Sequence, residues 1–493
     1  MNETPIYDLR PLLAFLAPLV GLIGIALAGE KRANLRELFT FLAAITQASL
    51  VLSMLPLVHG GAVIEFQVWQ IFTNVPLLFR VDGPGLLFAC VASILWIATT
   101  LYSVGYMRGL HEHAQTRFYS FFALSLSATI GVAFSANLLT IYFFYEMLSV
   151  STFPLVTHMQ DKEARTGGRT YLGYLLFTSL CLLLPALSWC YVWLDGGEVA
   201  MDFIADTGKL EFFSETTQMI LLALFTFGFA KAGVMPLHSW LPGAMVAPTP
   251  VSALLHAVAV VKVGVFCVYR VYADLFGSEV LQNMTGQEWM IGLACATILI
   301  SSFIALSQDN LKRRLAFSTI GQLGYVVLGA TLATEQGMGG SVLHIAMHAC
   351  GKITLFFCAG AIFVASGKKY VSQLRGLGRQ MPITMGAFMI GSLSVIGLPP
   401  LGGFVSKWYL ALGALDRDAM WVVFVLLLSS LLNVFYLLPV AVTAFFRNED
   451  DTDDSGIKEA PWACVVPLAL TAIGCFALFF LSGPLLRLAG ITQ

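Results

Sequence analysis

Long apolar stretches constrain the fold of this chain more than any other feature. Of its 493 residues, 58% are apolar and only 11% are charged, whereas about a quarter of the residues in a soluble domain are charged. Stretches of about 20 mostly apolar residues recur along the whole chain, with short polar connections between them. The sequence therefore predicts an all-α polytopic membrane protein with a single integral domain, 1–493. The fourteen predicted spans are 10–28, 36–58, 83–106, 117–134, 137–157, 167–194, 217–240, 249–274, 289–307, 314–333, 339–366, 382–413, 419–446 and 461–486.

Lysine and arginine residues are divided unequally between the two sets of predicted loops. Seventeen lie in the loops after odd-numbered spans, and six lie on the other side. Because cytoplasmic loops are enriched in these residues, both termini are expected to face away from the cytoplasm. The segment 1–11 has neither the basic start nor the cleavage site of a signal peptide, so the first span is expected to remain as an anchor.

Four lysines and one glutamate lie away from the ends of the predicted spans, where no arginine lies. They are Glu146, Lys231, Lys262, Lys352 and Lys407. Each such group at the centre of a bilayer costs about 2.5–3.5 kcal/mol on insertion scales, which marks them as functional candidates. A lysine removed from water can release its proton near neutral pH, whereas an arginine stays charged. The preference for lysine therefore indicates proton transfer rather than structural cations.

Glu146 and Lys231 are predicted to act as a couple. A lysine that moves toward or away from a buried carboxylate changes the proton affinity of both groups. The alternative is that Glu146 only hydrogen-bonds neighbouring helices. Lys262 would then accept the proton from Lys231, and His256, six residues earlier, would either organise water or be packed in the core.

Two predicted spans contain matching breaks. The seventh carries 233–237, GVMPL, and the twelfth carries 397–403, GLPPLGG. Proline removes a backbone donor and frees carbonyl groups that lipid cannot satisfy, so such breaks must face protein or water. Matched broken helices in two halves indicate a transporter built from repeats, with its ion path at the membrane midplane. The alternative is that these residues only kink packed helices.

The eleventh span carries a polar stripe formed by His344, His348 and Lys352. A spacing of four places all three on one helix face, which suits a relay of titratable groups. A metal site is the alternative for two histidines four apart, but a third ligand is not in view, so no metal site is predicted. Lys407 follows the second break and would be the terminal donor or acceptor, unless it extends to the membrane interface.

Other features bear less on function. The nine cysteines show no ligand spacing and are expected to be small buried residues. The acidic segments 195–216 and 448–460 are expected to be solvated loops, the latter with cation or basic-partner binding as its alternative. No phosphate-binding glycine motif or redox ligand set is present, so no cofactor is predicted. The net charge of −2 gives no indication of a nucleic-acid partner.

Four sequence runs resemble the proton-conducting antiporter-like subunits shared by respiratory complex I, membrane-bound hydrogenases and Mrp-type cation/proton antiporters. They are PLHSWLPGAMVAPTPVSALLHAVAVVKVGVF (236–266), QDNLKRRLAFSTIGQLGYVVLG (308–329), HIAMHACGKITLFFCAGAI (344–362) and GLPPLGGFVSK (397–407). The resemblance covers about 85–460. It implies fourteen helices, with spans 4–8 (117–274) and 9–13 (289–446) forming two inverted repeats around broken helices seven and twelve.

The resemblance also implies roles for individual residues. Glu146, Lys231, Lys262 with His256, and Lys407 occupy the family positions that form a hydrated proton axis, and His348 and Lys352 would bridge the halves. The expected location is a bacterial or archaeal cell membrane. The expected partners are other membrane subunits and the lipid bilayer. Direct sodium binding by this chain is not predicted, and the sequence leaves open whether a sodium path lies in a partner.

The length of the chain and the lysine at position 407 resemble the Mrp D subunit. A subunit of the Mrp D type is therefore the first expectation. Three functions are compared: a module of a sodium/proton antiporter, a pump module of a redox-driven or inorganic-carbon uptake complex, and a scaffold that only resembles a pump. The polar axis argues against the scaffold, because a scaffold could replace costly buried charges with leucine.

Overall fold

A computed structural model describes residues 5–72, 75–193, 210, 213–446 and 456–491, without the side chains of residues 72, 193, 255, 256 and 446. Its chain is mostly helical. The helices are α1 Arg10–Ala28, α2 Ala33–Ser53, α3 Leu55–His59, α4 Gly83–Gly109, α5 Gln115–Ala133, α6 Leu138–Val156, α7 Lys162–Thr178, α8 Leu184–Trp193, α9 Glu215–Gly228, α10 Trp240–Gly243, α11 Thr249–Ala253, α12 Val260–Arg270, α13 Ser278–Asn283, α14 Gln287–Ser307, α15 Leu311–Leu332, α16 Glu335–Ser366, α17 Leu377–Gln380, α18 Pro382–Ile396, α19 Gly402–Asp416, α20 Met420–Phe446, α21 Trp462–Phe480 and α22 Ser482–Leu488.

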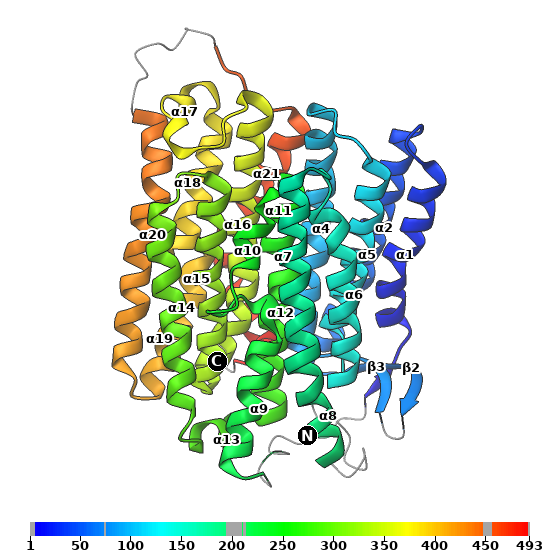
Figure 1. Cartoon of the computed structure of the whole chain (residues 1–493), viewed down its shortest axis with the longest axis vertical. Helices are drawn as coiled ribbons and strands as arrows, with labels where there is room; N and C mark the ends of the chain where they lie inside the picture. The colour runs from blue at the N-terminus through cyan, green and yellow to red at the C-terminus, as the bar shows by residue number, and fades with distance from the viewer. Residues whose placement is uncertain (1–4, 73–74, 194–209, 211–212, 447–455, 492–493) are drawn as a thin grey trace.

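The helices lie side by side along the long axis of the molecule (Figure 1). Within the described residues, ten helical segments are long and apolar enough to cross a membrane. The other predicted spans coincide with α5 and with three sets of shorter pieces, in which breaks or π-helical turns divide one span into two or more helices. The prediction of a polytopic membrane protein is thereby confirmed.

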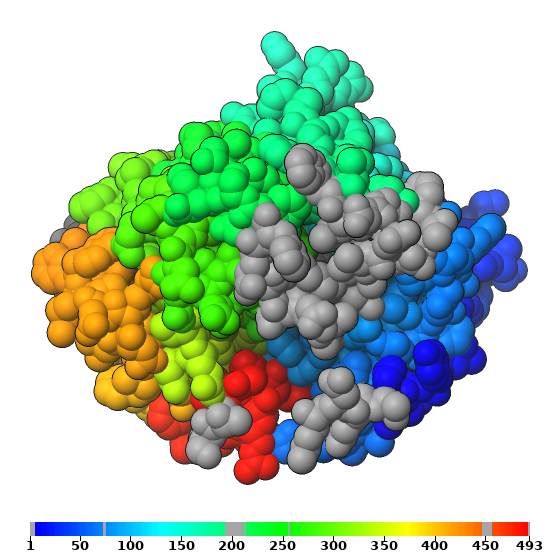
Figure 2. All heavy atoms as spheres, turned by 90° about the horizontal axis from the view of Figure 1, so that it is seen from below, coloured from blue at the N-terminus to red at the C-terminus, as the bar shows by residue number. Residues whose placement is uncertain are grey.

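The 32-residue helix α16 is the centre of the bundle. It packs against α4, α11, α15, α18, α19 and α21. In Figure 1, α20 forms one flank, and α1 and α2 form the opposite flank. Seen from below in Figure 2, the orange and blue residues of these flanks lie on opposite sides, with the red C-terminal residues between them. Any polar side chain on α16 therefore faces protein rather than lipid over most of its length.

Both predicted breaks are present. Neighbouring side chains form hydrogen bonds with backbone groups that have no helical partner at a break. After α9, one 3₁₀ turn, Ala230–Ala232, leads into an irregular segment. The Trp240 indole donates to the Ala230 carbonyl at 3.0 Å, and the Thr297 hydroxyl accepts from the Met235 amide at 3.3 Å. The second break separates α18 from α19, and Gly397 there has a φ of 93° that favours glycine. Polar partners inside the protein thus replace water.

A three-stranded sheet corrects the expectation of an all-helical chain. Strand β2, Ile64–Phe72, pairs antiparallel with β3, Val75–Val81, and β1, Ile6–Tyr7, pairs parallel with β2. The segment between α3 and α4 alternates polar and apolar residues and is too short for a further span. Its backbone is satisfied by strand pairing at the lower end of the bundle (Figure 1). The sheet therefore lies in the connection between the predicted spans 36–58 and 83–106 and not within a span.

The cysteines follow their prediction with one exception. All nine are free thiols, six are buried and two are partly buried. Cys181 is exposed, which contradicts the expectation for that residue. It lies in the π-helical turn Ser179–Leu183, on an outward face that Phe177 and Leu180 share. Of the two acidic segments, residues 194–209, 211–212 and 447–455 lie outside the described part of the chain.

A buried ion pair joins the start of α4 to the end of α12. Arg270 is 2% exposed, and its guanidinium contacts Asp82 at 2.5 Å and Asp274 at 2.8 Å. We expect Asp82→Asn to lower the free energy of unfolding by about 3 kcal/mol, because it leaves part of a buried charge unpaired. Thermal unfolding in detergent measures this loss. Arg417→Gln is the matched control, since its partner Glu288 is largely exposed, and its loss should stay below about 1 kcal/mol.

Candidate functional site

Lys231 lies inside the first break and is fully buried. Its ammonium group donates to the Tyr145 carbonyl at 2.9 Å and to the Ser149 hydroxyl at 2.7 Å, both on α6. It also lies 3.1 Å from the centre of the Tyr145 ring. Helix α12 can approach this break because residue 264 is glycine, where a Cβ atom would overlap the Lys231 backbone. Lys231 thus has three neutral partners in a closely packed environment.

Glu146 lies next to Tyr145 on α6, but its carboxylate does not contact Lys231 directly. Among the described residues, no ion pair or hydrogen bond joins Lys231 to Glu146 or to Lys262. The Oε1 atom of Glu146 is buried without a hydrogen-bond partner. Neutral groups therefore hold Lys231, and within the described residues the buried Oε1 of Glu146 accepts no hydrogen bond. The Glu146–Lys231 couple stays a prediction.

Lys262 and His348 join the two halves of the bundle. The ammonium of Lys262 on α12 lies 2.5 Å from Nδ1 of His348 on α16, and both residues are buried. The ring of His348 stacks on that of His344 with 5.7 Å between centroids and an interplanar angle of 5°. His344 contacts the Ser406 hydroxyl at 2.8 Å and Gln322 Oε1 at 3.2 Å. A continuous series of polar groups thus runs from α12 through α16 to α19.

Lys407 closes the second break rather than extending toward the membrane interface. Its ammonium donates to the Val395 and Ile396 carbonyls at 3.0 and 2.9 Å, and to the Ser430 hydroxyl at 3.1 Å. The two carbonyls are among those that lack helical partners at the end of α18, and a cation is favourable at such an end. The ammonium also lies 4.8 Å from the centre of the Tyr325 ring, which stacks against His344.

Lys352 and His256 complete the set of predicted residues. Lys352, fully buried on α16, donates to the Ser318 hydroxyl at 2.6 Å, and Ser318 accepts from Tyr436 at 2.9 Å. The side chain of His256 lies outside the described residues, and its backbone belongs to the π-helical turn Leu254–Val258.

The sequence analysis missed the neutral side chains that contact these lysines, His344 or Ser318. They are Tyr145, Ser149, Ser318, Gln322, Tyr325, Ser406, Ser430 and Tyr436. Hydroxyl and amide side chains are common in transmembrane helices, so they stand out only when a tertiary neighbour is known.

Buried lysines and buried arginines have different partners in this protein. Arg80 and Arg270 lie against carboxylates. Within the described residues, Lys231, Lys262, Lys352 and Lys407 form no ion pair with a carboxylate and contact only hydroxyls, carbonyls, aromatic rings or an imidazole. A carboxylate partner fixes the charged state, whereas neutral partners tolerate both the ammonium and the amine. This arrangement suits groups that gain and release protons.

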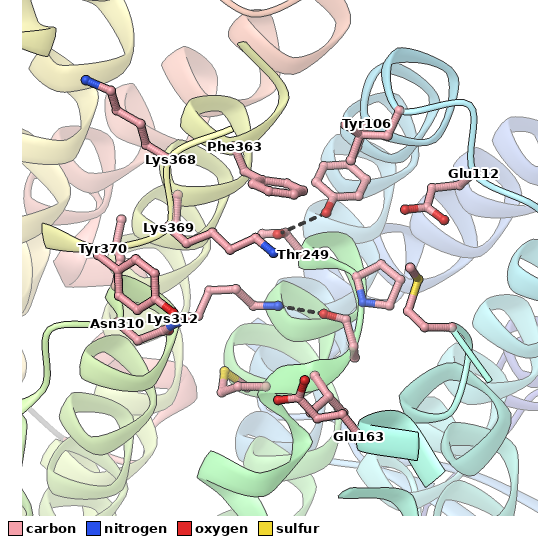
Figure 3. Close-up of a pocket in the computed structure, with 18 of the residues that line it drawn as sticks. Tyr106, Glu112, Glu163, Thr249, Asn310, Lys312, Phe363, Lys368, Lys369 and Tyr370 are labelled. Carbon is pink, nitrogen blue, oxygen red and sulfur yellow. Dashed lines mark hydrogen bonds between the residues drawn. The ribbon is translucent and has the colours of Figure 1, made fainter. Parts of the chain in front are cut away.

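A polar cavity of about 460 Å³ opens between the two halves, at the end that carries the loops after odd-numbered spans. Figure 3 shows Glu112 and Glu163 on one side and Lys312, Lys368 and Lys369 on the other. The ammonium of Lys312 donates to the Ala247 carbonyl at 2.6 Å, directly before α11. The sequence analysis counted Lys312 only as a loop charge, but it lies in the first turn of α15. The cavity thus reaches the segment that leads to Lys262.

A family model and curated relatives match most of this chain. A family model described as "NADH:quinone oxidoreductase/Mrp antiporter, TM" matches residues 135–433. The chain is 32% identical to NADH-quinone oxidoreductase subunit N of Desulforudis audaxviator over 403 residues, which cover 78% of this chain and 77% of that protein. It is 30% identical to the A/B component of a probable K(+)/H(+) antiporter of Rhizobium meliloti over 402 residues, 80% of this chain but 38% of the relative.

Solved structures share the fold. A chain of the Mrp complex from Dietzia sp. superimposes with a TM-score of 0.86 at 22% identity, covering 98% of this chain and 96% of that one. A chain of the archaeal membrane-bound sulfane sulfur reductase superimposes with a TM-score of 0.84, also at 22% identity. The whole described bundle therefore has counterparts of nearly equal length.

Proposed function

Because the chain belongs to the NADH:quinone oxidoreductase/Mrp antiporter transmembrane family, we propose that it moves protons across a membrane as one subunit of a multisubunit complex. The observation that carries this proposal is the series of buried lysines and histidines with neutral partners. Glu146, Lys231, Lys262 and Lys407 are the proton-transfer groups. His256, His344, His348 and Lys352 are the relay between the halves.

The contacts of the relay support an order of transfer. Lys262 lies within hydrogen-bonding distance of His348, whose ring stacks on His344, and His344 contacts Ser406 beside Lys407. A neutral imidazole can accept a proton at one nitrogen and release one from the other. Internal water would connect Lys231 to Lys262, since Lys231 has only protein partners on α6 among the described residues.

We propose fourteen membrane spans arranged as two inverted repeats, 117–274 and 289–446. The matched breaks support this arrangement, since each contains a glycine with positive φ followed by proline, Gly233 and Gly397. Each break also has a lysine beside it, Lys231 and Lys407, bonded to carbonyl oxygens. Both termini would face away from the cytoplasm of a bacterial or archaeal cell. The polar cavity of Figure 3 would then be the cytoplasmic opening of the path.

The proposed complex is an Mrp-type sodium/proton antiporter, in which this chain is the D-like subunit while sodium passes through a partner. The near-complete overlap with a chain of the Mrp complex supports this choice. The second candidate is the pump module of a redox-driven complex, which the 32% identity to subunit N favours. Isolation of the native complex separates the two: an antiporter couples sodium gradients to proton movement and contains no iron–sulfur protein.

Lys407→Arg tests whether this group must release its proton. Arginine keeps the charge that binds the Val395 and Ile396 carbonyls but stays protonated, so the complex should assemble while proton transport falls by about tenfold or more. Transport is measured with a pH-sensitive dye in proteoliposomes that contain the purified complex. Ser430→Ala is the matched control, because it removes one contact of the same ammonium but keeps a lysine that can release its proton. Normal transport by the arginine variant would make Lys407 a structural cation.

A further inference from the structure

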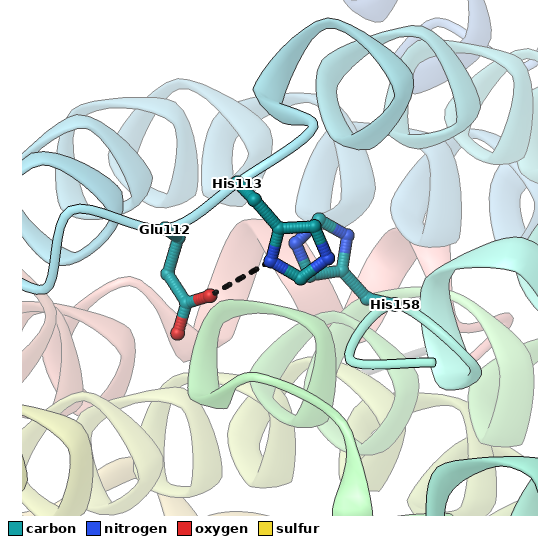
Figure 4. A group of neighbouring side chains, drawn as sticks. All are labelled: Glu112, His113 and His158. Atoms are coloured by element: carbon teal, nitrogen blue, oxygen red, sulfur yellow. Dashed lines mark ion pairs between the residues drawn. The ribbon is translucent and has the colours of Figure 1, made fainter. Parts of the chain in front are cut away.

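Three potential ligand side chains meet on two loops beside the polar cavity of Figure 3, and none of them is among the proposed proton-transfer or relay residues. Glu112 and His113 lie between α4 and α5, and His158 lies just after α6 (Figure 4). Each offers one ligand atom, and these atoms all lie within 4.8 Å of one another. The rings of His113 and His158 are 4.9 Å apart, and His113 Nδ1 lies 3.8 Å from the Glu112 carboxylate.

The imidazole of His158 is fully buried, and within the described residues neither Nδ1 nor Nε2 makes a hydrogen bond of good geometry. A buried imidazole normally has at least one partner, because leaving such a group unsatisfied costs about 1–3 kcal/mol. Figure 4 shows this ring beside that of His113, so an ion placed between them could bind both.

Two charged side chains border the cluster. The Arg117 guanidinium donates to the His158 carbonyl at 2.8 Å, which places a positive charge beside this loop. The carboxylate of Glu112 supplies a negative charge next to the two rings, which favours a bound cation.

We infer that Glu112, His113 and His158 form a binding site for a zinc-class divalent ion that links the α4–α5 loop to the loop after α6. Two imidazoles and one carboxylate are a common ligand set for Zn²⁺, with water as the fourth ligand. Mg²⁺ and Ca²⁺ prefer oxygen ligands and would not compete. Ligand atoms around tetrahedral zinc lie about 3.3 Å apart, and the half-exposed ring of His113 can rotate to close this distance.

Backbone conformation near the cluster agrees with this inference. His111, Ala114 and Gln160 have φ values of 51°, 47° and 58°, which residues other than glycine rarely adopt. Strained backbone of this kind persists where the surrounding structure holds it, and it is frequent at ligand sites. The site was not predicted from the sequence, because 44 residues separate His113 from His158 and only tertiary packing brings them together.

Zinc titration of the purified complex tests the inference. The complex is treated with a chelator in detergent and titrated with Zn²⁺ by calorimetry, and Co²⁺ absorption reports the geometry. We expect one site per chain, visible tetrahedral Co²⁺ bands and no competition from excess Mg²⁺. His158→Gln, His113→Gln and Glu112→Gln should each weaken Zn²⁺ binding by about a hundredfold, since each removes one ligand.

His111→Gln is the matched control, because this exposed neighbour lies on the same loop but outside the cluster, and its Zn²⁺ affinity should equal that of the wild type. If His158→Gln fails to fold, the half-exposed His113 provides the decisive variant. Wild-type protein that binds no Zn²⁺, or His113→Gln protein that binds it as tightly as wild type, would overturn the inference. None of these measurements depends on proton transport.

Discussion

Replacing Lys231 by alanine should abolish proton transport while the complex still assembles. The ammonium lies fully buried inside the first break, in contact with α6 and on the proposed route toward Lys262. Loss of a positioned proton donor or acceptor typically costs a factor of about 10²–10⁴ in rate. Proteoliposomes that contain the variant complex should therefore show no proton movement above background in the pH-sensitive dye assay.

Two further variants make this result specific. Glu146→Ala should also abolish transport, because the proposed couple needs a carboxylate that responds to the position of the lysine. Ser149→Ala is the matched control: it removes a 2.7 Å contact of the same ammonium but leaves the carbonyl of Tyr145 and both titratable groups in place. The control should retain most of its transport. A Lys231→Ala complex that transports protons normally would refute the role assigned to this residue.

Gly403→Ala should cost about 3 kcal/mol of stability, because the new side chain meets backbone rather than a movable side chain. A Cβ atom at this position would overlap the Ser394 carbonyl, near the end of α18. The second break can relieve the overlap only by moving α19 away, which also carries Lys407 away from the Val395 and Ile396 carbonyls. The thermal unfolding midpoint and the transport rate should therefore both fall.

Gly386→Ala provides the control for this substitution. Gly386 lies within α18, and nothing lies within 4 Å of a Cβ atom placed there, so alanine should leave stability equal or slightly higher. An unchanged unfolding midpoint for Gly403→Ala would show that the two helices are not packed as closely as described.

The amino-acid sequence was sufficient to predict most of the helical segments. The predicted span 10–28 coincides with α1, and the span 289–307 differs from α14 by two residues at its start. This agreement has a simple cause, since a membrane requires a long apolar stretch wherever a helix crosses it. The small sheet was not predicted, because β2 and β3 lie in a connection where the membrane imposes no such pattern.

The breaks were predicted because glycine and proline leave a sequence signal. Gly233 and Gly397 adopt positive φ values, which glycine tolerates, and Pro236 and Pro399 follow them within the same breaks. The π-helical turns were not predicted, since their residues have the same apolar character as those of the adjacent α-helices. Such turns depend on how neighbouring helices pack.

The candidate proton carriers could be proposed from the amino-acid sequence, because the cost of burying lysine in an apolar span makes each one conspicuous. Their partners became visible only in the folded bundle. Lys231 contacts Ser149 from 82 residues away, and Lys262 contacts His348 from 86 residues away. The same holds for Glu112, His113 and His158, whose proximity depends on two loops of a folded bundle. The free-energy cost of burying a charged residue depends on that residue and its span, so it can be inferred from the sequence. A contact depends on how segments far apart in the sequence pack against each other.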